Sequence, residues 1–278
     1  MMKKKKFMFG LLLLMVSGVV MLLHGTGLAA CPDGIVAYWK LDESAGPTYV
    51  DFVGDNDGEG AASPTAVPEG KVNGAQEFAS GLGINVPASK AFNWAATDSF
   101  SIEMWVKTDS TPTDVNRVLV GRGIGDLGNA FWWVGLSRDE NGNAGKPVFF
   151  LREADNSRRK FIAQTDITDG EWHHLVAARN GVDDTYFLYV DGVNEATLDD
   201  SLGNMADGFA STEDLNIGHV NDLLRFFGQI DEVAIYDRVL TESEIQGHIN
   251  SGTDYCEGAA EAENNFAPFP EATVALWP

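Results

Sequence analysis

Apolar and polar residues alternate in several short runs of this chain, which is the pattern of half-buried antiparallel strands. Clusters of turn-forming residues separate the runs, at 44–47, 54–64, 123–129, 139–147, 180–184 and 199–208. Alternate residues of each run share one face, as two stacked antiparallel sheets require. The spacing therefore predicts an all-β sandwich with no linker inside it. The runs contain Ile102, Met104 and Val106; Val118 and Val120; Val148 and Phe150; Leu175 and Ala177; and Phe187 and Tyr189.

One short helix is predicted near the C-terminal end, over residues 242–250. Thr241 is a suitable N-cap, and Glu244 completes a T-x-x-E capping box. Gly252 suits the end of the helix, because glycine readily adopts the left-handed conformation found there.

Four segments of the sequence point to one family. They read GIVAYWKLDESAG (34–46), DGEWHHLVAARN (169–180), YFLYVDG (186–192) and GQIDEVAIYDRVLTESEI (228–245). Their order and wording resemble laminin-G-like domains of the concanavalin A-like lectin/glucanase superfamily. The resemblance implies a jelly-roll sandwich of two antiparallel sheets over residues 31–257. Because that superfamily includes lectins, adhesion modules and hydrolases, the fold alone does not fix the function.

The first 30 residues have the three parts of a secretory signal. Lys3–Lys6 form a positive region, Phe7–Leu23 an apolar region and Gly27–Ala30 a small-residue exit. A membrane-spanning anchor is the alternative, since the apolar run approaches the length needed to span. We expect cleavage, and an extracellular or periplasmic domain without a transmembrane span. Residues 258–278 are rich in Ala, Glu, Asn and Pro and are expected to be a disordered tail or a truncated linker.

The two cysteines, Cys31 and Cys256, lie at the two ends of the predicted domain. In an exported protein such a pair suggests a disulfide. Leu28-Ala29-Ala30-Cys31 also looks like a bacterial lipobox, in which Cys31 would be lipidated and would anchor the protein to a membrane. One thiol cannot do both. We favour the disulfide, because lipidation would leave Cys256 unpaired.

The chain is strongly acidic, with 19 Lys and Arg against 41 Asp and Glu and a net charge of −22. Loss of the four lysines in the first 30 residues leaves 15 basic against 41 acidic residues, a net charge of −26. Such a surface repels nucleic acid and anionic lipid. Neutral glycans, cations and extracellular proteins remain as partners, and we expect a monomeric domain.

A calcium ion is one candidate ligand, because residues 51–60 hold several oxygen donors between glycines. In laminin-G-like domains a loop of this kind can approach the Asp of the G-x-I-D-E-V strand. The resemblance therefore implies that Asp51, Asn56 and Asp231 share one structural Ca²⁺. Asp231 also lies in an apolar strand, where an unpaired carboxylate is costly. The alternative is that these side chains cap turns and accept backbone hydrogen bonds.

Catalytic groups are sparse, and we predict that the chain is not an enzyme. Glycosidases of this broad fold have an E-x-D-x-x-E strand, and this sequence has none. Glu153 and Asp155 have a suitable spacing for paired carboxylates, but we interpret them as solvated charges at a hairpin turn. His173 and His174 are adjacent on a predicted strand and must face opposite ways.

Carbohydrate binding has more support, since sugar sites combine aromatic side chains with a few polar groups. Trp132 and Trp133 are neighbours on a strand, so one of them must face away from the core. The candidate ligand-binding residues are Trp133, Arg122 in a glycine-rich loop at 121–125, Arg225 and Phe226. We predict a secreted, non-catalytic module that binds a carbohydrate or extracellular glycoconjugate. The alternatives are a protein-interaction or adhesion module without sugar binding and a polysaccharide hydrolase or lyase.

Overall fold

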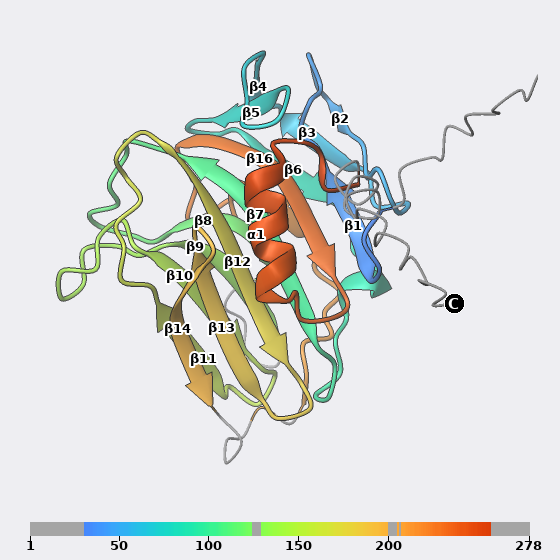
Figure 1. The fold of residues 1–278 in the computed structure, drawn as a ribbon, viewed down its shortest axis with the longest axis vertical. Coiled ribbons are helices and arrows are strands. Elements are labelled where there is room, and N and C mark those ends of the chain that lie inside the picture. The colour runs from blue at the N-terminus through green and yellow to red at the C-terminus, as the bar shows by residue number, and fades with distance from the viewer. Residues whose placement is uncertain (1–30, 124–128, 200–204, 206, 257–278) are drawn as a thin grey trace, which may run out of the picture.

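Two antiparallel sheets face each other across a shared core (Figure 1). This computed structural model describes residues 31–123, 129–199, 205 and 207–256. Within these residues each sheet has eight strands, and one α-helix lies near the C-terminal end. The predicted jelly-roll sandwich is confirmed. The expected signal segment, residues 1–30, and the expected tail, residues 258–278, lie outside the described residues.

We name the two sheets A and B. Sheet A has the order β14-β13-β12-β7-β16-β5-β4, and β1 also pairs with β16. Its strands are β1 (Ile35–Trp39), β4 (Thr65–Val67), β5 (Ala75–Phe78), β7 (Phe100–Lys107), β12 (Trp172–Asn180), β13 (Thr185–Val190), β14 (Val193–Asp199) and β16 (Gly228–Tyr236).

Sheet B has the order β11-β10-β9-β8-β15-β6-β3-β2. Its strands are β2 (Thr48–Tyr49), β3 (Gly58–Ala62), β6 (Gly83–Val86), β8 (Arg117–Arg122), β9 (Phe131–Leu136), β10 (Pro147–Arg152), β11 (Arg158–Ile162) and β15 (Leu215–Ile217). A short 3-10 helix, η1 (Lys90–Phe92), precedes β7 and buries Phe92 in the core.

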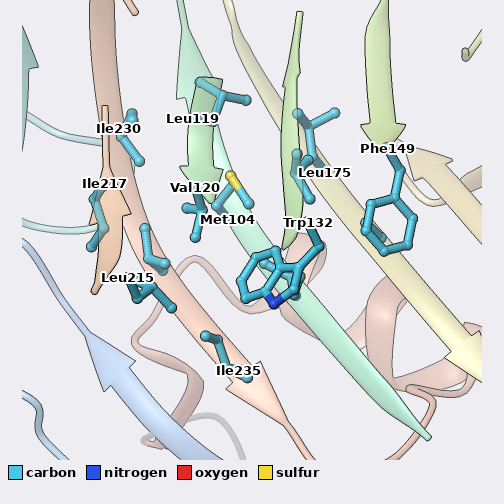
Figure 2. Packing of buried hydrophobic residues seen from close by; sticks show 14 of the residues in the cluster. Met104, Leu119, Val120, Trp132, Phe149, Leu175, Leu215, Ile217, Ile230 and Ile235 are labelled. Carbon is cyan, nitrogen blue, oxygen red and sulfur yellow. The ribbon is translucent and has the colours of Figure 1, made fainter. Parts of the chain in front are cut away.

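The core forms where the inner faces of the two sheets meet (Figure 2). Sheet A contributes Met104 and Leu175, and sheet B contributes Trp132 and Phe149. Burial of each such side chain contributes about 1.5–3 kcal/mol of free energy. The apolar positions of the alternating runs therefore explain why the strands stack in two layers.

One predicted pair of residues does not share a face. Val118 packs on the outer face of sheet B, whereas Val120 lies in the core. The pairing of β8 with β9 shifts register between these residues, so the strand bulges at Leu119 and the alternation moves by one position. Strand β8 also continues through Gly121 and Arg122, where we had expected a loop.

The predicted helix is confirmed as α1 (Glu242–Ser251). Both hydrogen bonds of the Thr241–Glu244 capping box are present, and Gly252 ends the helix in the left-handed conformation. The helix lies across the outer face of sheet A (Figure 1), where Ile245 joins a second apolar cluster with Tyr38 and Tyr236. No helix in the described part of the chain is long and apolar enough to cross a membrane.

The two ends of the domain lie together beside this cluster. Strand β1 pairs with β16, the last strand, and Cys31 and Cys256 are joined by a disulfide with their Cα atoms 3.9 Å apart. This bond occupies the thiol that lipidation of Cys31 would need.

Candidate functional site

The outer faces of the two sheets differ in what covers them. Sheet A is covered by α1 and by the segment that leads to Tyr255 and Cys256. No α-helix within the described residues covers the outer face of sheet B (Figure 1). Sheet B is therefore the more open of the two for a binding surface.

One row of paired residues crosses the whole of sheet B. Its polar half begins at Asn216 of β15, which pairs with Asn85 on one side and with Gly121 on the other. Gly121 in turn pairs with Trp133. Directly paired residues point to the same face of a sheet, and neighbouring strands are about 4.8 Å apart. The complete row from β11 to β2 is Lys160, Phe150, Trp133, Gly121, Asn216, Asn85, Glu59 and Thr48.

The aromatic half of the row is a stack of three rings. Phe150 lies between Phe131 and Trp133, with ring centroids 5.4 Å from each and nearly parallel planes. Trp132 fills the core and Trp133 faces outward, as the alternation of the strand predicts. Trp133 is only 5% exposed, so the stack supports a surface and does not offer an open ring face. Gly121 keeps the neighbouring position small, because a Cβ there would lie 2.7 Å from the Cβ of Trp133.

The polar half of the row opens into a cavity of about 290 Å³. Strands β6 and β15 contribute Asn85 and Asn216, and two loops contribute the other residues that line it. All eight are polar: Asn85, Thr212, Glu213, Asp214, Asn216, His219, Asn221 and Asp222.

Hydrogen bonds between the asparagines fix the orientation of their side chains. Asn216 Nδ2 donates to Asn85 Oδ1 over 2.9 Å, and Asn216 Oδ1 accepts from the backbone N–H of Asn221 over 2.8 Å. Asn221 Nδ2 donates to Glu213 Oε2 over 3.3 Å. Within the described residues the Nδ2 group of Asn85 has no acceptor, so its two N–H donors are available to a ligand.

His219 is a neutral member of this pocket. Burial, helped by the nearby guanidinium of Arg225, lowers the pKa of His219 to about 4. Its Nδ1 accepts from the backbone N–H of Asp222 over 3.1 Å, which is consistent with an uncharged ring. The carboxylates of Glu213, Asp214 and Asp222 therefore dominate the charge of the pocket. It favours hydroxyl groups or a cation over an anionic ligand.

Two of the predicted ligand-binding residues lie inside the fold instead. Arg122 is 1% exposed and uses all five N–H groups within the chain, on the carbonyl oxygens of Phe92, Ser89, Ser211 and Glu213 and on Asn93 Oδ1. Phe226 is also 1% exposed and belongs to the core. A direct contact of either residue with a ligand does not fit this arrangement. Arg122 thereby holds Ser211 and Glu213, which lie in or next to the wall of the pocket.

Arg225 lies beside the pocket residue Asp222. Its Nη2 pairs with Asp222 Oδ1 over 2.9 Å, and its Nη1 donates to the carbonyl oxygen of Leu82 over 3.1 Å. The guanidinium thus holds the pocket residue Asp222 against the turn before β6.

Asp51 and Asn56, two of the residues predicted to bind calcium, form a closed turn. Asp51 accepts from the backbone N–H groups of Tyr38, Val53 and Asn56 and from Asn56 Nδ2, over 2.8–3.2 Å. These four bonds fill the ordinary acceptor capacity of a carboxylate. Asp51 therefore has the contacts expected if it caps a turn instead of binding calcium.

Asp231, the third predicted calcium ligand, lies in a different setting. Its Oδ2 accepts from the backbone N–H groups of Lys71 and Val72, each over 2.9 Å, and its buried Oδ1 has no partner. Burial raises the pKa of Asp231 to about 8 despite these two bonds. The orphaned oxygen fits a cation, but no hydrogen bond within the described residues links Asp231 to Asp51 or Asn56. The shared site remains a prediction.

The buried acids and histidines under α1 do not form an accessible catalytic centre. Glu103 is fully buried and contacts His174 Nε2 over 2.9 Å and His248 Nδ1 over 2.8 Å. Tyr236 also donates to Glu103, over 3.0 Å. Because Glu103 and His174 are fully buried and His248 belongs to α1, this network holds the helix on the sheet.

The pocket could not be predicted from local sequence patterns, because its residues come from three separate segments around 85, 212–216 and 219–222. The local signal is an asparagine within each of the short strands β6 and β15, because asparagine is uncommon in strands.

The family model described as "Concanavalin A-like lectin/glucanases superfamily" matches residues 79–246. No curated protein matches the chain by sequence. Solved structures with the same fold include the binding domain of Paraclostridial Mosquitocidal Protein 1, with 18% identity and a TM-score of 0.62 over 79% of this chain and 52% of that one.

Two further structures were solved with a ligand. Domain 4 of AbnA, a GH43 extracellular arabinanase from Geobacillus stearothermophilus, in complex with arabinotriose, has 20% identity and a TM-score of 0.57 over 76% of this chain and 96% of that one. The binding domain of Botulinum Neurotoxin DC in complex with SialylT has 15% identity and a TM-score of 0.56 over 80% and 52%. This chain therefore spans about half the length of the toxin domains, and at these identities the likeness is one of fold.

Proposed function

Since the chain belongs to the concanavalin A-like lectin/glucanase superfamily, we propose that it is a non-catalytic module that binds a neutral carbohydrate on the outer face of sheet B. The observation on which this rests is the polar cavity beside the aromatic stack, in one row across the sheet. Domain 4 of the arabinanase, which has the same fold, was solved with a bound oligosaccharide.

The pocket has the chemistry that sugar hydroxyls require. The N–H donors of Asn85 can bond to hydroxyl oxygens, and the carboxylates of Glu213, Asp214 and Asp222 can accept from hydroxyl hydrogens. The network through Asn216 and Asn221 holds these groups in place before a ligand arrives, which lowers the entropy cost of binding.

The negative charge of the pocket favours uncharged carbohydrates over anionic ones. Three carboxylates line the cavity, and the whole chain has a net charge of −22. A sialylated or sulfated glycan would be repelled. A neutral chain that lies along the row, across the strands, could reach from the pocket toward the stack of Trp133 and Phe150.

The proposed function is tested by isothermal titration of the protein with neutral oligosaccharides identified on a glycan array, in calcium and again in EDTA. Asn85→Ala removes the free donors and is expected to weaken binding about tenfold or more, which corresponds to about 1.4 kcal/mol or more. Asn194→Ala, on the exposed edge strand β14 of sheet A, is the matched control and should bind as the parent protein does. Binding that is unchanged in Asn85→Ala, or confined to anionic glycans, would contradict the proposal.

A protein-interaction module is the second candidate, because one loop exposes large apolar side chains. Phe52 is 54% exposed and Val50 is 50% exposed, beside Lys40, whose Nζ lies 3.9 Å from the centre of the Phe52 ring. An extracellular protein could bury this loop. Failure of every glycan on the array to bind would favour this candidate. The disulfide fits an extracellular location for either function.

A further inference from the structure

Three carboxylates that do not line the pocket converge where β10 ends. Glu153 follows β10, Asp155 lies in the hairpin between β10 and β11, and Asp207 lies in the segment that leads toward β15. One carboxylate oxygen from each residue lies within 4.8 Å of the others. The interpretation of Glu153 and Asp155 as solvated charges of a turn is wrong for Glu153, whose side chain is buried.

Glu153 is completely buried and half of its carboxylate has no partner. Its Oε1 accepts from the backbone N–H groups of Asp207 and Gly208, over 2.9 and 2.7 Å. Its Oε2 is buried without a hydrogen bond. An unsatisfied buried carboxylate oxygen costs free energy, and two further acids beside it add repulsion. Burial, together with Asp155 and Asp207, accordingly raises the pKa of Glu153.

A cation between the three carboxylates removes both costs. We propose that Glu153, Asp155 and Asp207 bind one Ca²⁺ ion. All three offer hard oxygen ligands and no nitrogen or sulfur, which favours Ca²⁺ over Zn²⁺. Asp155 and Asp207 are exposed, so water can complete the six to eight ligands that Ca²⁺ prefers. Irregular loop ligands suit Ca²⁺ better than Mg²⁺, which demands a near-ideal octahedron.

The ion would fasten a segment that reaches the carbohydrate pocket. From Asp207 the chain passes Phe209, whose N–H donates to the carbonyl oxygen of Trp94 over 2.7 Å. It then reaches Ser211 and Glu213, whose carbonyl oxygens accept from Arg122. The segment ends at Thr212–Asp214, in the wall of the pocket. Calcium would thus fix one end of this segment, and Arg122 fixes the other.

Calcium titration of the full chain, freed of metal with a chelator, tests the site without any carbohydrate. Glu153→Gln keeps an oxygen for the N–H groups of Asp207 and Gly208, and Asp155 is exposed, so Glu153→Gln and Asp155→Asn should both fold. Each is expected to weaken calorimetric Ca²⁺ binding about tenfold or more and to reduce the calcium-induced rise in melting temperature. Glu171→Gln, at an exposed turn, is the matched control and should bind calcium as the parent chain does.

Three outcomes would overturn the assignment. The first is an absence of calcium binding in the parent chain, or equal binding in the parent chain and in both variants. The second is a rise in melting temperature with Mg²⁺ that equals the rise with Ca²⁺. A calcium effect lost in Asp231→Asn but retained in Glu153→Gln would likewise place the ion at Asp231 and contradict the site proposed here.

Discussion

At the scale of single residues, His173 and His174 show how a strand gives neighbours opposite environments. His173 bonds to Asp191 through Nδ1 over 2.8 Å and to Asp169 through Nε2 over 3.1 Å, near the start of β12. His174 faces the other way, onto the buried Glu103. Burial alone would raise the pKa of Glu103, but hydrogen bonds from His174 and His248 hold it at about 2. His173 therefore pairs with two partly exposed carboxylates, whereas His174 stabilises the charged form of a buried one.

The ion pairs of His173 predict a loss of stability at alkaline pH. The hydrogen bond to Asp191 is the main cause that raises the pKa of His173 to about 9, from 6.5 in an unfolded chain. The folded state therefore binds the proton more tightly. The stabilisation is complete below pH 6.5 and is lost as the pH rises through 9.

Thermal unfolding between pH 6 and 9.5 measures this effect. We expect the melting temperature to fall across that interval, by roughly 2–4 °C for each kcal/mol lost. In His173→Gln the fall should be shallower, with the larger difference from the parent protein at pH 6. Parallel curves for the two proteins would show that the histidine does not titrate as described.

At the scale of elements, the capping box of α1 makes the next prediction. Thr241 Oγ1 accepts from the N–H of Glu244, and Glu244 Oε2 accepts from the N–H of Thr241 over 2.8 Å. Thr241→Ala removes one of these bonds and is expected to cost about 1 kcal/mol of unfolding free energy. Urea unfolding measures the loss. Thr241→Ser keeps the hydroxyl and serves as the control. Equal losses of unfolding free energy in the two variants would mean that the Thr241 hydroxyl does not stabilise the helix.

Strands and helices can be predicted from the sequence where a pattern of neighbouring residues determines them. Alternation located β7 and β12, and the capping box located α1, because these signals depend on near neighbours in the chain. The bulge at Leu119 was not predictable, since it depends on how β8 pairs with β9. A second shift, between Asp231 and Ala234 in β16, depends in the same way on pairing with β7.

The candidate site was less accessible to sequence reasoning than the elements were. Alternation predicted that one of Trp132 and Trp133 faces outward, and the structure places Trp133 there. The buried state of Arg122 did not, because its five acceptors come from residues 29 to 91 positions away. The orphaned oxygen of Glu153 likewise depends on a segment 54 residues further along the chain. Local patterns specify which face a residue occupies, and the distant partners decide whether it is free to bind.

At the scale of the whole molecule, the disulfide closes the domain where its first and last strands meet. Cys31 and Cys256 are 225 residues apart in sequence, so their bond removes a very long loop from the unfolded ensemble. In the chain-entropy model a loop of this length is worth about 5 kcal/mol, which is an upper figure because unfolded chains keep some structure. The pairing of β1 with β16 already holds these ends in the folded state.

Loss of the disulfide should therefore destabilise the protein without changing its fold. We expect the Cys31→Ser, Cys256→Ser double variant to melt up to roughly 10–20 °C below the oxidised parent, given about 2–4 °C for each kcal/mol. The parent protein under reducing conditions should melt with the double variant, because both lack only the crosslink. Far-UV circular dichroism checks that the sheets persist. If reduction leaves the melting temperature of the parent unchanged, Cys31 is not bonded to Cys256 in solution, and lipidation of its thiol becomes the explanation to test by mass spectrometry.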